Sequence, residues 1–130
     1  MAARPPKGLT LVELLLAAAL LATAAVPVIE ATTRGLDLAY QVDVRTKAVM
    51  LAQQEMESAM ARLMENFALD VTQNSADLGD GYRVTIQAVT GLYKKTFTVR
   101  VGRDKNGNSI LDGSEVLITL ATSVPDMTAY

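Results

Sequence analysis

Lys7-Gly8-Leu9-Thr10-Leu11-Val12-Glu13-Leu14-Leu15-Leu16 is the stretch that decides the fold, because it begins the longest element that the sequence predicts. A short basic head, residues 1–7, precedes Gly8, and an apolar run follows from Leu9 to Ile29. At about 1.5 Å per helical residue this run reaches about 31 Å, roughly the thickness of a bilayer core. The two basic residues of the head favour a cytoplasmic N-terminus. The sequence therefore predicts one membrane span at residues 9–29, with the following chain on the other side.

Glu13 is the one carboxylate inside this apolar run. An ionised side chain within a span costs about 2.5–3.5 kcal/mol at mid-bilayer, and less near the end where Glu13 lies. An ordinary secretory signal peptide or an uncleaved signal anchor leaves Glu13 without a role. The Ala-rich segments after the run are also poor sites for signal peptidase. We therefore expect Glu13 to have a function of its own.

Residues 7–13, followed by an apolar helix, resemble the class III signal of type IV pilins and type II secretion pseudopilins. In that family a membrane aspartyl prepilin peptidase cuts after the glycine and then methylates the new N-terminus. The resemblance implies cleavage between Gly8 and Leu9, methylation of Leu9, and Glu13 as the fifth residue of the mature chain. Leu9 departs from the phenylalanine or methionine that is more usual there, and Pro27 lies three positions earlier than in many pilins.

The chemistry of this segment has a physical rationale. Glycine has no side chain, so an extended substrate can pass a tight protease cleft at Gly8. Cleavage leaves a cationic amine on Leu9, and in an apolar helix bundle both this amine and Glu13 need a partner of opposite charge. A neighbouring subunit staggered along the helix axis supplies both partners, since opposite charges attract strongly when desolvated. We expect Glu13 to set the register of an assembled bundle.

The composition is typical of one small domain that joins a larger assembly. The chain has 130 residues, a formal net charge of −2, and no cysteine, histidine or tryptophan. Loss of the basic head makes the charge more negative, which argues against a general nucleic-acid binder. Ser-His, Cys-His and zinc constellations cannot be built from these residues, so we expect no enzyme.

Residues 30–67 are expected to continue the helix as an amphipathic half, since good helix formers dominate. Pro27 removes one backbone donor and is expected to kink the helix near residues 23–27. An apolar stripe at helical spacing consists of Val49, Ala52, Met56, Ala59, Met60, Leu63 and Phe67. We interpret the stripe as a face that packs on a sheet; the alternative is an adaptable contact surface, because methionines are flexible.

The C-terminal half predicts a polar connection and three strands. Residues 68–81 are rich in turn-forming residues and predict a loop, and alternating runs predict strands at 82–89, 96–101 and 116–124. Thr90–Tyr93 predicts a hairpin turn. The expected fold is α+β: a long kinked N-terminal helix packed on a small antiparallel three-stranded sheet, with residues 82–130 as the β-domain. The pilin-like fold has the same organisation.

The connection before the last strand has the spacing of an EF-hand calcium loop. Oxygen-bearing side chains occupy loop positions one, three, five, nine and twelve, and a main-chain carbonyl occupies position seven. These residues are Asp104, Asn106, Asn108, Asp112 and Glu115, with the carbonyl of Ile110. Ser109 stands at position six, where glycine is expected, and the flanks are strands rather than helices. Two interpretations of residues 104–115 stay open: a Ca²⁺ site, and a solvated turn that uses the same polar residues.

These features predict a minor pilin-like structural subunit. The short β-domain and the stretch Leu51–Glu57 resemble the I-type minor pseudopilins and small minor pilins. The resemblance implies as partners the prepilin peptidase, the membrane, and other pilins bound through the N-terminal helix. It implies an inner-membrane protein with a periplasmic C-terminal domain that enters a pilus or pseudopilus. The competing hypothesis is a signal-anchored exported calcium-binding protein that does not polymerise.

Overall fold

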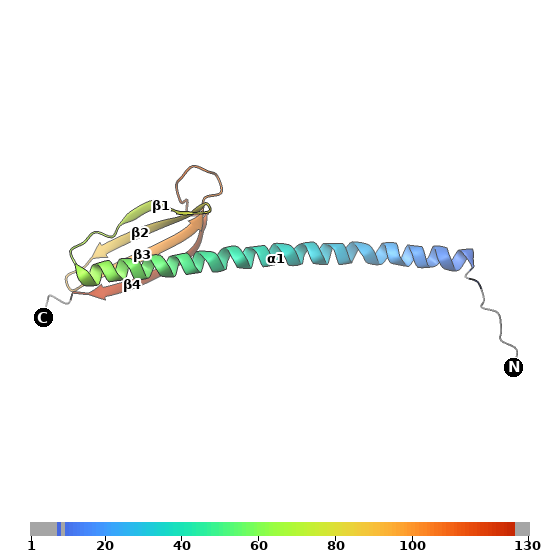
Figure 1. The fold of residues 1–130 in the computed structure, drawn as a ribbon, viewed down its shortest axis with the longest axis horizontal. Coiled ribbons are helices and arrows are strands. Elements are labelled where there is room, and N and C mark those ends of the chain that lie inside the picture. The colour runs from blue at the N-terminus through green and yellow to red at the C-terminus, as the bar shows by residue number, and fades with distance from the viewer. Residues whose placement is uncertain (1–7, 9, 127–130) are drawn as a thin grey trace, which may run out of the picture. The chain divides into compact units, whose positions relative to one another are not determined.

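The structure is a computed structural model that describes Gly8 and residues 10–126. One helix and four strands follow in order: α1 (Leu11–Glu65), β1 (Gln73–Gly79), β2 (Tyr82–Thr90), β3 (Lys94–Arg103) and β4 (Val116–Pro125) (Figure 1). The strands form one antiparallel sheet in the order β1-β2-β3-β4. The fold class is therefore α+β, with one long helix and an antiparallel sheet, as the sequence predicts.

The expected number of strands is wrong, because β1 lies inside the stretch that the sequence predicts to be a loop. Its sequence lacks apolar alternation, and its pairing with β2 is irregular at two points. The strand forms because a two-residue turn, Asp80-Gly81, folds the chain back onto β2. Both turn residues have positive φ, 53° and 76°, which is the geometry of the hairpin turns that Asp-Gly favours. Main-chain pairing defines this strand, together with the limited burial of Ala76 and Leu78 against the core.

The other three strands are confirmed, each with ends one or two residues longer than expected. β2 pairs with β3 without interruption from Tyr82↔Arg103 to Thr90↔Lys95. The hairpin turn expected after Thr90 is present, since β2 ends at Thr90 and β3 begins at Lys94. β3 pairs with β4 with one irregularity, next to Gly102.

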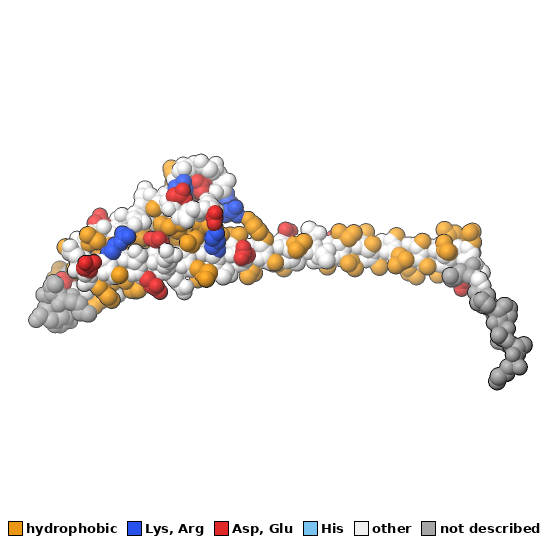
Figure 2. All heavy atoms as spheres, in the orientation of Figure 1, with side chains coloured by type: hydrophobic (Ala, Val, Ile, Leu, Met, Phe, Trp, Pro, Cys, Tyr) orange, Lys and Arg blue, Asp and Glu red, His pale blue; other side chains and the backbone are white. Residues whose placement is uncertain are grey.

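Helix α1 begins at Leu11, ends at Glu65 and continues through Pro27 without interruption. The expected kink at Pro27 therefore does not break the helix. The chain divides into two units, Met1–Gln41 and Val42–Tyr130, so α1 contributes to both. In the first unit the described residues of α1 are exposed throughout, and hydrophobic side chains cover it along its length (Figure 2).

The core belongs to the second unit. Phe97, Val99 and Val101 of β3 are completely buried, together with Val84 and Ile86 of β2. The helix contributes Ala48, Ala52, Ala59 and Leu63, with Val44, Leu51, Met56 and Met60 half-buried beside them. The predicted stripe therefore packs on the sheet at Ala52, Ala59 and Leu63, and Ala48 is a core residue that the stripe omitted. Small residues at the buried positions suit a close approach of helix to sheet.

The N-terminal part of α1 is long and apolar enough to span a membrane. Core helices of soluble proteins meet the same criterion of length and composition, but they are mostly buried. Leu14, Leu20 and Ile29 are each at least 60% exposed. A signal sequence near the N-terminus also meets the criterion, which does not by itself distinguish it from a membrane span.

Candidate functional sites: the helix start and the acidic loop

Glu13 lies in the first turn of α1 and forms a capping box with Thr10. The Glu13 carboxylate accepts hydrogen bonds from the backbone N–H and the hydroxyl of Thr10, both at 3.0 Å. The Thr10 hydroxyl in turn accepts a hydrogen bond from the Glu13 N–H at 3.3 Å. Each residue thus satisfies a donor that the start of a helix leaves without an intrahelical partner. Glu13 has a local structural role that sequence reasoning missed, although the spacing Thr-x-x-Glu indicates it.

Two other residues are expected to take part in processing. Gly8 is exposed, and nothing lies within 4 Å of where a side chain would be. Leu9, the expected new N-terminus, lies outside the described residues. Cleavage and methylation therefore stay predictions, and the described geometry at Gly8 places no obstacle beside the expected scissile bond.

The loop between β3 and β4 is held together by Asp104. Its carboxylate accepts hydrogen bonds from the backbone N–H groups of Gly107, at 2.7 Å, and Ser109, at 2.9 Å. It also pairs with the Arg83 guanidinium, Nε to Oδ2, at 3.2 Å. Burial raises the pKa of Asp104, but the hydrogen bonds from Ser109 and Gly107 and the Arg83 charge outweigh this effect and hold the pKa below its usual value.

Glu115 closes the other end of the loop and is 5% exposed. One of its carboxylate oxygens accepts hydrogen bonds from the N–H groups of Lys105, at 2.8 Å, and Asn106, at 3.3 Å. The other accepts from the N–H of Asp112 at 3.3 Å. Three backbone N–H groups therefore replace the hydrogen bonds to water that this carboxylate loses on burial.

Asp112 and the two asparagines form a separate cluster. The Asp112 carboxylate accepts hydrogen bonds from the side-chain amides of Asn106, at 2.9 Å, and Asn108, at 3.3 Å. The amide oxygen of Asn106 accepts from the Asn108 N–H, and that of Asn108 accepts from the Ile110 N–H. The predicted calcium ligands thus all lie in one loop, but their oxygens take part in hydrogen bonds within the loop. In the part of the chain that the structure describes, no three acidic side chains are grouped to hold a metal.

Ser109 adopts the backbone conformation that position six of a calcium loop requires. Its φ is 64°, in the left-handed region that favours glycine. Gly107 also has a positive φ, of 71°. The replacement of glycine by serine therefore does not prevent the turn. The φ of Ser109 suits position six of a calcium loop, but the described carboxylates do not converge, so the Ca²⁺ site stays a prediction.

Arg83 and Ser75 anchor this loop to the sheet, and sequence reasoning missed both. Arg83 donates to the Ser75 carbonyl at 2.9 Å besides pairing with Asp104. The Ser75 hydroxyl accepts a hydrogen bond from the Leu111 N–H at 2.9 Å. Ser75 precedes Leu111 by 36 residues, and no local pattern in the sequence connects them. Only the unpredicted strand β1 brings Ser75 to the loop.

No family model matches the chain, and neither the curated proteins nor the solved structures include one that is significantly similar to it.

Proposed function

We propose that this chain is a minor pilin-like structural subunit, cleaved between Gly8 and Leu9 by a prepilin peptidase and assembled with other subunits through α1. The observation that carries the proposal is the exposed apolar half of α1, with a glycine before it and Glu13 in its first turn. A long exposed apolar helix joined to a small α+β unit suits a subunit whose helix is covered first by lipid and then by other subunits.

The capping box supports this proposal and adds a detail to it. Cleavage after Gly8 leaves Thr10 as the second residue and Glu13 as the fifth, so the new N-terminal amine is four residues before Glu13 in the sequence. The carboxylate is then held by Thr10 at the helix start, ready to accept a cation from its own chain or from a neighbour. In a signal-anchored protein that does not polymerise, Glu13 would still cap the helix, but its negative charge would have no partner.

Calcium binding by residues 104–115 is a second, separate proposal. The positive φ of Ser109 and the burial of Glu115 favour it, because both are features of a loop that folds around its side-chain oxygens. The loop is closed by its own hydrogen bonds, so cation binding requires carboxylates to exchange N–H partners for the ion. The ion would be held by the side chains of Asp104, Asn106, Asn108, Asp112 and Glu115 and by the main-chain carbonyl of Ile110.

The first test concerns processing. Co-expression of the full chain with a prepilin peptidase should remove residues 1–8, and intact mass should show a chain that starts at Leu9, with one added methyl group. Gly8→Arg should block cleavage, because a long side chain does not fit a cleft that admits glycine. Gly35→Arg, in the exposed middle of α1, is the matched control and should be processed normally. A mature N-terminus beyond Ala25 would contradict the proposal and indicate an ordinary signal peptidase.

A further inference from the structure

Asn106 is the only asparagine of this chain that a glycine follows. The others, Asn66, Asn74 and Asn108, precede phenylalanine or serine. The backbone nitrogen of the next residue can attack the side-chain amide of an asparagine, and a side chain on that residue hinders the attack. Glycine hinders it least, since it has no side chain and the widest choice of backbone conformations. Asn106 and Gly107 are both exposed, so the acidic loop before β4 contains the asparagine that the sequence makes most reactive.

The loop restrains both of the groups that would react. The Gly107 nitrogen, which is the nucleophile, donates its N–H to the Asp104 carboxylate at 2.7 Å. The amide nitrogen of Asn106 donates to the Asp112 carboxylate at 2.9 Å, and its amide oxygen accepts from the Asn108 N–H at 3.0 Å. Attack requires the nitrogen to lose its proton and approach the side-chain carbon, so these hydrogen bonds must break first. The negative charge of the adjacent carboxylate also opposes loss of that proton.

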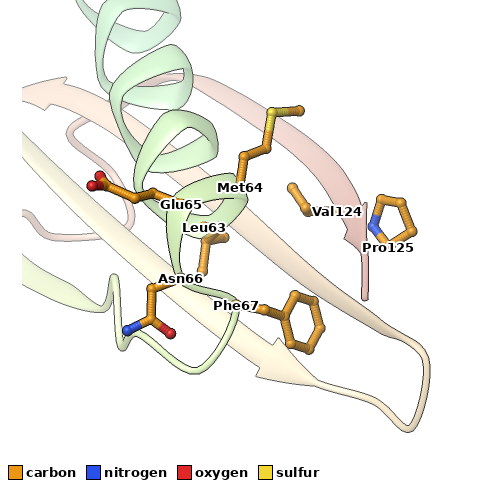
Figure 3. Close-up of a pocket in the computed structure, with 7 residues that line it drawn as sticks. All are labelled: Leu63, Met64, Glu65, Asn66, Phe67, Val124 and Pro125. Atoms are coloured by element: carbon orange, nitrogen blue, oxygen red, sulfur yellow. The ribbon is translucent and has the colours of Figure 1, made fainter. Parts of the chain in front are cut away.

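Asn66 makes the same local turn but is followed by a bulky residue. Its side-chain oxygen accepts a hydrogen bond from the Ala68 N–H at 3.0 Å, as that of Asn106 does from Asn108. Asn66 is exposed just beyond the end of α1 and lines an apolar pocket of about 170 Å³ together with Phe67 (Figure 3). The size of Phe67 hinders attack on Asn66. Asn106 has no such hindrance, so its protection must come from the hydrogen bonds of the loop.

We propose that Asn106 is a latent deamidation site, which the carboxylates of Asp104 and Asp112 protect while the loop is closed. In the reaction the Gly107 nitrogen forms a bond to the side-chain carbonyl carbon of Asn106, and the bond from that carbon to the amide nitrogen breaks. The amide group leaves as ammonia, whose third hydrogen is the proton that the Gly107 nitrogen loses. Water then opens the cyclic imide at either of its two C–N bonds, which gives aspartate or isoaspartate at position 106. This inference depends neither on cleavage at Gly8 nor on cation binding.

Deamidation changes the hydrogen bonding of the loop. The Asn106 amide donates to the Asp112 carboxylate, and a carboxylate at position 106 replaces this donor with a second negative charge. Two like charges at that distance repel each other, so the aspartate product favours an open loop. Asn106→Asp carries this product and should melt at a lower temperature than the unchanged protein in chelator. Asn66→Asp, at an exposed position outside the loop, is the matched control and should melt normally; equal melting of the two variants would overturn this effect of the product.

The test of the site is incubation of the full chain in detergent micelles at neutral pH with chelator. Mass spectrometry of the peptide that contains residue 106 measures the conversion of its amide to a carboxyl group. The same chain unfolded in guanidinium chloride gives the unprotected rate. Asn106 should deamidate at least about tenfold more slowly in the folded chain, the factor that corresponds to one hydrogen bond to a charged group. Asn66 is the internal control, and its rate should stay low in both states because its hindrance is local.

Two loop variants identify the source of the protection. In the folded chain Asp104→Ala should accelerate deamidation of Asn106 by about tenfold or more, and Asp112→Ala should accelerate it less, because it frees the amide and not the nucleophile. Glu57→Ala, which removes an exposed carboxylate of α1, should leave the rate unchanged. Asp104 also pairs with Arg83, so circular dichroism checks the fold, and Asp112→Ala decides if Asp104→Ala does not fold. Deamidation of the unchanged protein as fast when folded as when unfolded, or no acceleration in the folded variants, would overturn the proposal.

Discussion

At the residue scale, Glu13 has an observed role as a helix cap and a proposed role in the register of an assembly, and deletion of its side chain removes both. Its carboxylate caps the start of α1 through Thr10, and in the proposed assembly its charge pairs with a cationic amine. A capping box accepts glutamine in place of glutamate, because the amide oxygen also accepts the N–H of the capping residue. Glutamine at position 13 therefore keeps the cap and removes the charge.

We expect Glu13→Gln to insert into the membrane normally and to fail in assembly with partner pilins as severely as Glu13→Val. Insertion should be intact or better in both variants, since each makes the span less charged. Co-purification from crosslinked membranes measures the assembly. Should Glu13→Gln assemble like the unchanged protein while Glu13→Val does not, the carboxylate serves the cap and not the register.

Of the described glycines, Gly102 has the least room for a side chain. A Cβ at this position would lie 2.2 Å from the carbonyl oxygen of Glu115 and 2.6 Å from the Leu111 side chain. Gly102 also adjoins the one irregularity in the pairing of β3 with β4. The absence of a side chain lets the end of the acidic loop lie directly against β3.

We expect Gly102→Ala to lower the free energy of unfolding by about 1–3 kcal/mol, the usual cost of overpacking a buried site. Urea denaturation of the full chain in detergent micelles, followed by circular dichroism, measures this change. Gly113→Ala is the control, because nothing lies within 4 Å of its Cβ position, and it should be close to neutral. Equal stability of the two variants would contradict the close approach at Gly102.

At the element scale, Lys95 joins β3 to the chain that leaves α1. The residue is 4% exposed, and its ammonium donates to the carbonyls of Phe67, at 2.9 Å, and Leu69, at 2.8 Å. It also lies 5.4 Å from the centre of the Phe67 ring, within the range of a cation–π contact. Phe67 and Leu69 lie beyond the end of α1 at Glu65, and the buried ammonium supplies their carbonyls with a hydrogen-bond donor.

We expect Lys95→Met to destabilise the protein by about 2–4 kcal/mol, because two carbonyls lose a charged donor in a buried place. Lys94→Met, at the exposed neighbouring position, is the matched control and should change stability by less than about 0.5 kcal/mol. Chemical denaturation gives both values. A small effect of Lys95→Met would mean that water replaces the ammonium at these carbonyls.

The sequence predicts the elements whose pattern is local and omits those that depend on distant partners. α1 and strands β2, β3 and β4 have clear helical spacing or alternation, and the structure confirms them. β1 has neither, but the Asp80-Gly81 turn after it is a strong hairpin signal, and it would have indicated a strand on the N-terminal side of Tyr82. Residues 68–81 predict one loop, because the polar side chains of a loop and of an edge strand are alike.

The same distinction between local patterns and contacts of distant residues applies to the candidate sites. The capping box and the acidic loop are local patterns and are readable from spacing. The contacts of Arg83 and Ser75 with the loop, and of Lys95 with Phe67, join residues 21 to 36 positions apart, so they depend on the tertiary arrangement of the sheet and helix. Val49 and Phe67, in the predicted apolar stripe, are half-buried rather than buried, whereas Ala48 is completely buried. A spacing of i, i+3 and i+4 identifies the apolar face of a helix. It does not decide which of two adjacent residues, such as Ala48 and Val49, lies at the centre of that face.

At the scale of the whole molecule, the acidic loop connects three parts of the β-domain. Asp104 pairs with Arg83 of β2 and donates its N–H to the Gly81 carbonyl in the β1–β2 turn, at 2.9 Å. Leu111 binds the Ser75 hydroxyl of β1. Because of these contacts, ordering or disordering of this loop changes the stability of the sheet. Thermal unfolding of the domain is therefore a suitable measure of cation binding.

The choice of variant for a calcium test follows from these contacts. Asp104 pairs with Arg83, so its removal lowers stability whether or not a cation binds. The Asp112 carboxylate accepts hydrogen bonds from the side chains of Asn106 and Asn108, both in the same loop, so Asp112→Ala tests the ligand with less damage to the fold. Glu57→Ala, at an exposed position of α1, is the control for loss of one carboxylate.

We expect the full chain in detergent micelles to melt at a higher temperature in millimolar calcium than in chelator. A cation that binds only the folded state stabilises it by about 2.7 kcal/mol at a concentration a hundredfold above its dissociation constant, and extracellular calcium modules often bind at about 10⁻⁴–10⁻³ M. Magnesium should raise the melting temperature less, because it demands a smaller octahedral set of ligands. Asp112→Ala should lose most of the calcium effect, and Asp104→Ala with Asp112→Ala should lose all of it, whereas Glu57→Ala should retain it. Identical melting of the unchanged protein in calcium and in chelator would mean that the hydrogen bonds of residues 104–115 already complete the loop, and that it is a polar turn.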